Sequence, residues 1–280
     1  KTAKLDYSMG YMVVRDVEST AKIHISEISV LVVESTAVSV TAALLNELIN
    51  KKVKVMFCDD KHNPSFELTP YYGSHDCSLK LKRQISWNKT VKQFVWTQIV
   101  VEKIKNQAAV LDYYKLEQSS QLMEYIEEIE LNDKTNREGH AAKVYFNALF
   151  GKGFSRSDDC PVNAALNYGY SIILSIFNRE ITASGYLTQL GLFHDNMFNQ
   201  YNLSCDLMEP FRPFVDLTVR EMNPMKFDKE EKLQIYAMLS EEIRIDGRTQ
   251  TFINAIKIYC KSIFAAIEEN DISLIRFACR

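Results

Sequence analysis

The sequence lacks the long hydrophobic run that would mark a membrane protein. No stretch approaches eighteen consecutive apolar residues, and residues 1–4 lead into polar sequence instead of the apolar core of a signal peptide. We therefore expect a cytoplasmic protein that does not interact with a membrane. With 280 residues, 46% of them hydrophobic, the chain is long enough to bury a substantial core.

The residue patterns of zinc sites and of sites that bind nucleoside triphosphates are also missing. The six cysteines are widely scattered, without the close pairs of a zinc knuckle, so we expect free thiols. There is no H-E-x-x-H sequence, and residues Gly151, Lys152 and Gly153 have neither the spacing nor the Lys-Ser/Thr ending of a Walker loop. These absences argue against a zinc protease and against a P-loop ATPase.

A general excess of positive charge, typical of dedicated DNA-binding domains, is absent as well. The net charge is −3 and the sequence pI is about 6.0. The charges are nevertheless segregated, because residues 77–115 carry eight Lys or Arg and two acidic residues, whereas residues 116–133 carry six acidic residues and no Lys or Arg. Such segregation can produce a basic face on an acidic protein.

The hydrophobic pattern changes period along the chain. Short, mostly β-branched or aromatic segments around residues 12–14, 23–25, 30–33 and 53–57 predict strands, and residues 41–50 have the spacing of one helix. From Trp87 the period becomes about 3.6, which predicts helices over 88–110, 114–131, 136–150, 161–187, 206–221, 228–243 and 248–268.

The predicted fold class is α+β, with a small N-terminal β domain followed by a larger all-α domain. We place the β domain with its one helix at residues 1–76, a linker at 77–87, and the helical catalytic domain at 88–280. The stretch at residues 71–75 marks the boundary, because Gly73 and polar residues follow the last strand there.

Glu138 is the first candidate for chemistry. In a helix over residues 135–146 it shares a face with Ala141 and Tyr145, which should turn inward, so its carboxylate needs a partner. One explanation is a capping box, in which the side chains of Thr135 and Glu138 bind free N–H groups at the helix start. The other is ligation of a metal ion.

His194, Asp206 and Glu209 form the second group of candidates. Asp206 and Glu209, three residues apart, would lie on one face at a helix start, and Pro210 supports a start nearby. A capping box again explains the two carboxylates, and a single histidine is often a hydrogen-bonded structural residue. The residues by themselves leave ligation and structural roles open.

The sequence segments around these candidates resemble those of the CRISPR-associated integrases of spacer acquisition. They read NREGHAAKVYFNALFG, PVNAALNYGY, LGLFHDNMFNQYNLSCDLMEPFRP and FVD, supported near the N-terminus by VKVMFCDDKHNPSFELTPYYGSHD. The resemblance spans residues 136–216 of the helical domain and is closest to the type II-A branch of the family, the systems with a single large effector nuclease.

The resemblance assigns roles to the candidates. It implies metal ligation by Glu138, His194 and Glu209, with Asp206 as a neighbouring supporting or alternate ligand. Tyr168 aligns with a tyrosine near the family's active site and could orient the phosphate or the nucleophile, although a buried helical aromatic explains it equally well. Two carboxylates and one imidazole suit Mg²⁺ or Mn²⁺, whereas zinc would want more His or Cys.

The function implied by the resemblance is integration of DNA. A metal-dependent enzyme would join the 3′-hydroxyl ends of prespacer DNA to the CRISPR leader-repeat by transesterification, without ATP. The resemblance also implies double-stranded DNA as partner and a homodimer, with two dimers bridged into a hetero-hexamer by a small ferredoxin-like adaptation partner. A metal-dependent endonuclease that uses water, and a non-catalytic DNA-binding scaffold, are the alternatives.

Five basic residues are candidates for DNA binding. Arg137, Lys143 and Arg212 flank the proposed ligands, while Lys82 and Arg83 belong to a basic stretch interleaved with aromatic residues. Lysines and arginines on helices are usually just solvated, and tryptophans at helical spacing usually belong to the core, so the DNA role is a hypothesis for each of them.

Overall fold

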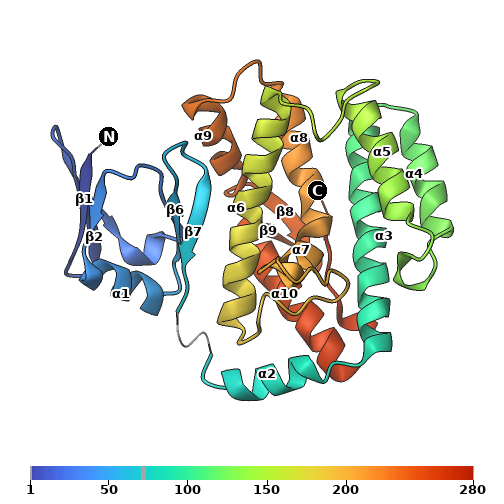
Figure 1. The fold of residues 1–280 in the computed structure, drawn as a ribbon, viewed down its shortest axis with the longest axis horizontal. Helices are drawn as coiled ribbons and strands as arrows, with labels where there is room; N and C mark the ends of the chain where they lie inside the picture. Colours follow the sequence, from blue (N-terminus) through green and yellow to red (C-terminus); the bar gives the residue numbers. More distant parts are fainter. Residues whose placement is uncertain (1, 71–73, 280) are drawn as a thin grey trace. The chain divides into compact units, whose positions relative to one another are not determined.

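The chain divides into two compact units, Lys1–His75 and Asp76–Arg280. The computed structural model describes residues 2–70 and 74–279, so residues 71–73 of the predicted boundary lie outside the described part. Figure 1 shows strands throughout the first unit and mostly helices in the second. This order, a small β region followed by a larger helical region, confirms the predicted fold class.

The smaller unit, in its described residues, is built from two sheets and two short helical segments. Its elements are β1 (Ala3–Ser8), β2 (Tyr11–Arg15), β3 (Thr20–His24), η1 (Ile25–Glu27), β4 (Val30–Val33), β5 (Val38–Val40), α1 (Ala42–Asn50), β6 (Lys54–Cys58) and β7 (Pro64–Leu68). The sheet of order β3-β2-β1-β5 is antiparallel except for its β1–β5 pair. In the sheet of order β4-β6-β7, the β4–β6 pair is parallel and the β6–β7 pair antiparallel.

The core of the smaller unit follows from its alternating and helical patterns. Leu44 and Leu48 of α1, four residues apart, turn the same helix face inward and are fully buried. They belong to one core cluster with Leu5, Met12 and Val55 of the strands. The side chain of Thr41 accepts the N–H of Leu44 and so caps the helix start. The predicted helix at residues 41–50 is therefore confirmed.

The larger unit carries the remaining elements. They are α2 (Cys77–Ile85), α3 (Lys89–Tyr113), α4 (Gln118–Glu127), η2 (Leu131–Asp133), α5 (Arg137–Phe150), α6 (Pro161–Ala183), α7 (Asn202–Met208), η3 (Glu209–Phe211), α8 (Arg212–Met222), α9 (Lys229–Met238), β8 (Glu242–Ile245), β9 (Arg248–Thr251), α10 (Phe252–Glu269), η4 (Ile272–Leu274) and β10 (Ala278–Cys279).

Helix α3 is the element around which the site is assembled. It packs against α4, α5, η3 and α8, and Figure 1 shows α3, α4 and α5 side by side. Trp96, Ile99 and Ile104 are fully buried on it. Because α5 and η3 both pack on α3, side chains from residues 138 and 209 can meet beside it.

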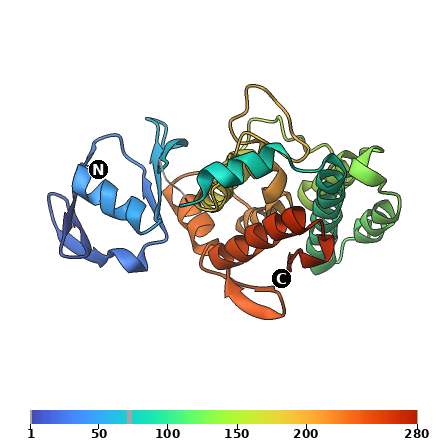
Figure 2. The same ribbon diagram turned by 90° about the horizontal axis from the view of Figure 1, so that it is seen from below.

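Two parts of the larger unit differ from the sequence-based prediction. The linker predicted over 77–87 is instead occupied by α2, whose Gln84 donates to the carbonyls of Leu187 (2.8 Å) and Leu190 (3.2 Å), an arrangement between distant segments that local sequence does not reveal. The unit is also not purely helical, because β8, β9 and β10 form a small antiparallel sheet. In Figure 2 the orange β8–β9 hairpin precedes the red helix α10.

None of the helices in residues 2–70 and 74–279 combines the length and the apolar character that crossing a membrane requires.

Candidate active site

Glu138 lies in the first turn of α5, and Asp133, not Thr135, caps that turn. The Asp133 carboxylate accepts the N–H of Arg137 (2.8 Å) and the N–H of Glu138 (3.1 Å). The hydroxyl of Thr135 instead donates to the carbonyl of Glu128. The capping box considered for Thr135 and Glu138 is therefore wrong, and the Glu138 carboxylate is available for another partner.

His194 is held by Asp206, which is completely buried within α7. The two oxygens of Asp206 accept the backbone N–H groups of Leu192 (2.6 Å), Phe193 (3.1 Å) and His194 (3.1 Å). Oδ1 also lies 2.6 Å from Nδ1 of the His194 ring. Because Asp206 shapes the loop before its helix and does not start that helix, the capping box considered for Asp206 and Glu209 is wrong.

The bond to Asp206 fixes the orientation of the His194 imidazole. With Nδ1 directed at a carboxylate, the other ring nitrogen, Nε2, becomes the donor atom, which is the arrangement found around metal-bound histidines. The hydrogen bond to Asp206 raises the pKa of His194, against the opposing effect of burial. Gly191 leaves room for this arrangement, since a Cβ there would lie 2.8 Å from Oδ2 of Asp206.

Glu209 is buried in η3 between two cations. Its Oε1 accepts from Nε of Arg212 (2.8 Å), and its Oε2 forms an ion pair with Nζ of Lys103. Burial would raise the pKa of Glu209, but Arg212 and Lys103 outweigh burial and lower it to about 2. The carboxylate is therefore ionised at any physiological pH.

Lys103 joins the two glutamates and was not singled out as a site residue by the sequence. Its ammonium forms ion pairs with both Glu138 and Glu209, and its side chain is only 9% exposed. Burial would lower the pKa of Lys103, but the charges of Glu209 and Glu138 raise it, so the ammonium is retained. A signal was present, because Lys103 interrupts the apolar stripe of Ile99, Val100 and Ile104 in α3. Because Lys103 is buried, it is not part of the basic face that residues 77–115 were predicted to form.

The candidate ligands are of the types that bind hard divalent cations, but they are not arranged around a common point. Within residues 2–70 and 74–279, no three His, Cys, Asp or Glu side chains are close enough together to hold a metal ion as they stand. The carboxylates of Glu138 and Glu209 nevertheless converge on a single cation, the Lys103 ammonium. Carboxylate oxygens with one imidazole nitrogen are ligands that suit Mg²⁺ and Mn²⁺.

Tyr168 lies away from these contacts. It is buried on α6, its hydroxyl is hydrogen-bonded to that of Tyr236 on α9, and its ring packs edge-on against Phe227. This favours the structural explanation that was left open for Tyr168. A different tyrosine of the same helix, Tyr170, reaches the site through Arg212.

Arg212 is held in place by a buried polar cluster on α6 and α8. Its guanidinium lies over the ring of Tyr170 at 4.6 Å from the ring centre, and the Tyr170 hydroxyl donates to Asp216. Asp216 is 1% exposed, and its burial raises its pKa to about 6 although Tyr170 and Arg212 act in the opposite direction. Stacking and the Glu209 ion pair together leave Arg212 little freedom.

The other proposed DNA-binding residues fall into two classes. Lys82 on α2 and Lys143 on α5 are exposed. Arg83 instead pairs with Glu268 (2.8 Å) and Arg137 with Glu128 (3.0 Å). Only the first two combine exposure with no such ion pair within the described part of the chain, so they remain the better candidates.

Aromatic packing ties the His194 loop to α3. The ring of Phe193 stacks on Trp96, with 4.6 Å between centroids, and the His194 ring meets Trp96 edge-on. Trp96 is fully buried, so this tryptophan belongs to the core and not to a DNA-binding surface. The loop carrying His194 is thus fixed to the same helix that carries Lys103.

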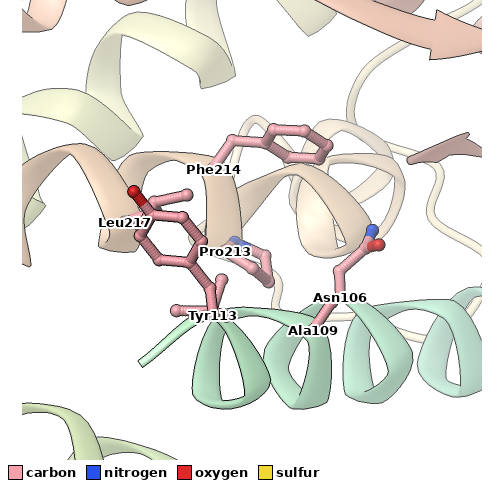
Figure 3. Close-up of a pocket in the computed structure, with 7 residues that line it drawn as sticks. Asn106, Ala109, Tyr113, Pro213, Phe214 and Leu217 are labelled. Carbon is pink, nitrogen blue, oxygen red and sulfur yellow. The ribbon is translucent and has the colours of Figure 1, made fainter. Parts of the chain in front are cut away.

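An apolar pocket of about 330 Å³ lies between α3 and α8 and does not include the proposed ligands. Figure 3 shows Asn106 and Tyr113 of α3 facing Pro213 and Leu217 of α8. Asn106 donates to the carbonyl of Pro210 (2.8 Å), the residue that follows Glu209. The pocket wall therefore contributes to the placement of η3.

A family model and known proteins with similar sequences both point to CRISPR-associated proteins. Residues 1–247 match the family model described as CRISPR associated protein Cas1. The CRISPR-associated endonuclease Cas1 of Neisseria meningitidis serogroup C (strain 8013) is 35% identical over 274 residues, which cover 96% of this chain and 90% of that protein.

Two solved structures have a similar fold at low sequence identity. A casposase bound to integration product has a TM-score of 0.78 at 16% identity, with 97% of this chain and 89% of that chain covered. A chain of a Cas6-RT-Cas1–Cas2 complex has a TM-score of 0.73 at 16% identity, with 98% of this chain and 35% of that chain covered.

The raised pKa of Asp216 predicts a pH dependence of stability. Between its usual value of 3.8 and about 6, folded Asp216 keeps a proton that the unfolded chain has lost, so its contribution to stability falls as pH rises through that window. In Asp216→Asn this loss is removed, while Asn can still accept from Tyr170. The free energy of unfolding of the variant relative to the original protein should rise by on the order of 2 kcal/mol between roughly pH 4.5 and pH 7.

Urea unfolding of both proteins at the two pH values measures this difference, because the other titrating groups cancel. A difference that stays constant between the two pH values would mean that Asp216 titrates normally.

Proposed function

Because the chain belongs to the Cas1 family of CRISPR-associated proteins, we propose that it joins the 3′-hydroxyl ends of prespacer DNA to a CRISPR leader-repeat by metal-dependent transesterification. The observation that carries the proposal is the convergence of the Glu138 and Glu209 carboxylates on one cation. His194, oriented by Asp206, is near enough for the charges of both carboxylates to act on its ring. Mg²⁺ or Mn²⁺ is the proposed ion, held by these three side chains.

The reaction exchanges one phosphodiester bond for another. The 3′-oxygen of the prespacer attacks the phosphorus, the bond from phosphorus to the 3′-oxygen of the target strand breaks, and the proton of the attacking hydroxyl ends on the released oxygen through water. The metal ion would stabilise the charge that builds up on the phosphate oxygens. No net phosphodiester bond is lost, so no ATP is consumed.

The protein's own residues would prepare this exchange. Glu138 and Glu209 would supply the carboxylate oxygens that hold the ion, and the bond of Asp206 to Nδ1 would leave Nε2 of His194 as the ligand atom. Arg212 is stacked on Tyr170 and paired with Glu209, so its guanidinium is a fixed cation that can bind a phosphate oxygen without reorganising. Lys82 and Lys143 are the proposed contacts to the DNA backbone farther away.

The proposed assembly places two such sites on one DNA. We propose a homodimer, two of which are bridged by a dimer of a small ferredoxin-like adaptation partner into a hetero-hexamer in the cytoplasm. The similar chain in a Cas6-RT-Cas1–Cas2 complex supports a partner of this kind, and the casposase bound to integration product supports a DNA substrate.

A second candidate function is hydrolysis of DNA. The relative in Neisseria meningitidis is called an endonuclease, and the same ligands could direct a water molecule at the phosphorus instead of a 3′-hydroxyl. A non-catalytic scaffold is a third possibility, in which the ion pairs of Glu138 and Glu209 serve only the fold.

Removing a metal ligand should stop the reaction even in a variant that still folds. Glu138→Gln, His194→Ala and Glu209→Gln should each lower strand transfer by at least about 100-fold, because each takes a donor atom from the ion. EDTA should have the same effect, reversed by Mn²⁺ or Mg²⁺. Gel assays of joined product measure the rates, and thermal melting with DNA-binding titrations checks that fold and affinity persist.

Glu128→Gln is the matched control, since Glu128 is an exposed glutamate that pairs with Arg137 outside the ligand set. Activity near the original level in all three ligand variants would dismiss the site, and rescue by zinc alone would mean that the ligand set has been misjudged.

The identity of the nucleophile separates the integrase from the nuclease. With the small partner and Mn²⁺ present, a duplex with free 3′-hydroxyls should become covalently joined to a leader-repeat target, and dideoxy 3′ ends should abolish joining because the attacking oxygen is missing. Target cleavage at an unchanged rate with blocked ends would identify water as the nucleophile. Absence of reaction with both substrates would favour the scaffold.

Lys82 should contribute to DNA affinity through the phosphate backbone. Lys82→Glu should weaken binding to all DNA sequences alike and reduce the slope of log affinity against log salt by about one, because one phosphate contact is lost. Arg83→Gln should have the smaller effect, since Glu268 already engages Arg83. Fluorescence anisotropy at several salt concentrations measures the affinity of both variants, with Lys257→Glu on α10 as the control. An unchanged slope in Lys82→Glu would mean that Lys82 is a solvated surface residue that does not contact DNA.

A further inference from the structure

Lys103 occupies the place between the two carboxylates that the proposed function assigns to the metal ion. Its Nζ pairs with Oε1 of Glu138 and with Oε2 of Glu209, and the remaining oxygen of Glu209 accepts from Arg212. The lysine is almost completely buried, so its charge is compensated by these two glutamates and not by water. The carboxylates therefore face an internal cation.

We propose that Lys103 is a built-in competitor of the metal ion, whose ammonium must withdraw from Glu138 and Glu209 before a divalent cation can bind between them. This inference rests on the proposed function. An ammonium and a divalent ion repel each other, and two carboxylates cannot satisfy both at contact distance in a buried site. The affinity of the site for metal is then the difference between two cations competing for the same oxygens.

The surroundings make Lys103, and not Arg212, the cation that moves. Arg212 is fixed by stacking on Tyr170 as well as by its bond to Glu209. Lys103 ends in a compact ammonium on a flexible four-carbon chain, and no aromatic ring of the described residues is stacked on it as Tyr170 is on Arg212. Metal binding therefore requires a side-chain movement on α3, not a rearrangement of the helices.

The exchange has two measurable consequences. Without the ammonium, Glu138 and Glu209 repel each other until a metal ion neutralises them, so a neutral residue at position 103 should raise metal affinity and lower stability in the absence of metal. The gain in stability on adding metal should grow accordingly, because ligand binding to the folded state adds to its stability.

The test compares neutral and charged residues at position 103. In Lys103→Met, isothermal titration should show the Kd for Mn²⁺ lowered by about tenfold or more, and the rise in Tm on adding Mn²⁺ should exceed that of the original protein. Lys103→Gln, which can still donate to both carboxylates, repeats the measurement if the Met variant does not fold. Lys103→Arg keeps the charge and should leave Mn²⁺ binding as weak as in the original protein, or weaker.

Lys105→Met is the matched control, because Lys105 is a half-exposed lysine of the same helix that pairs with Glu102. A Kd for Mn²⁺ that is unchanged or higher in both neutral variants would overturn the competition, and so would an equal gain in Lys105→Met. The original protein separates this failure from that of the proposed function. If it binds Mn²⁺ and joins DNA while the variants show no gain, only the inference about Lys103 fails.

Discussion

The ion pairs that Lys103 makes with Glu138 and Glu209 are the constraint on which the site depends. They connect three elements, α3, α5 and η3, at a point where each carries a charge that could not be buried alone. Removing one member would leave the other charges uncompensated, so the packing of these elements and the placement of the carboxylates are one problem. The chemistry proposed for the site uses the same charges that hold it together.

A second set of interactions prepares the histidine. Asp206, buried in α7, satisfies three backbone N–H groups of the loop at residues 192–194 and directs the imidazole as well. Phe193 of that loop stacks on Trp96 of α3. The loop is irregular in backbone but determined in position, which is what a ligand on a loop requires.

The arrangement also orders the cations by how firmly they are held. Arg212 is fixed by stacking and by Glu209, Lys103 is buried but flexible, and Lys82 and Lys143 are exposed to solvent. Cations of these three kinds suit different tasks: binding a phosphate at the reacting centre, exchanging with a metal ion, and following a DNA backbone through a layer of water. The net charge of the chain, −3, gives no indication of these differences between its cations.

The order of the two regions, most helices of the larger one, and the residues worth testing as ligands could be predicted from the sequence alone. Hydrophobic period is a local property, and it predicted α1, α3, α5 and α6 to within a few residues. The resemblance of four sequence segments to a known family supplied Glu138, His194 and Glu209.

The partners of these three residues, in contrast, depend on how the elements pack together. The capping role of Asp133, the support of His194 by Asp206 and the position of Lys103 between two glutamates join residues from different elements. Residues 103 and 209 meet because α3 and η3 pack together, and a contact across 106 positions of chain has no local signature. For the same reason α2 replaced a predicted linker, since its Gln84 binds carbonyls 103 and 106 residues away.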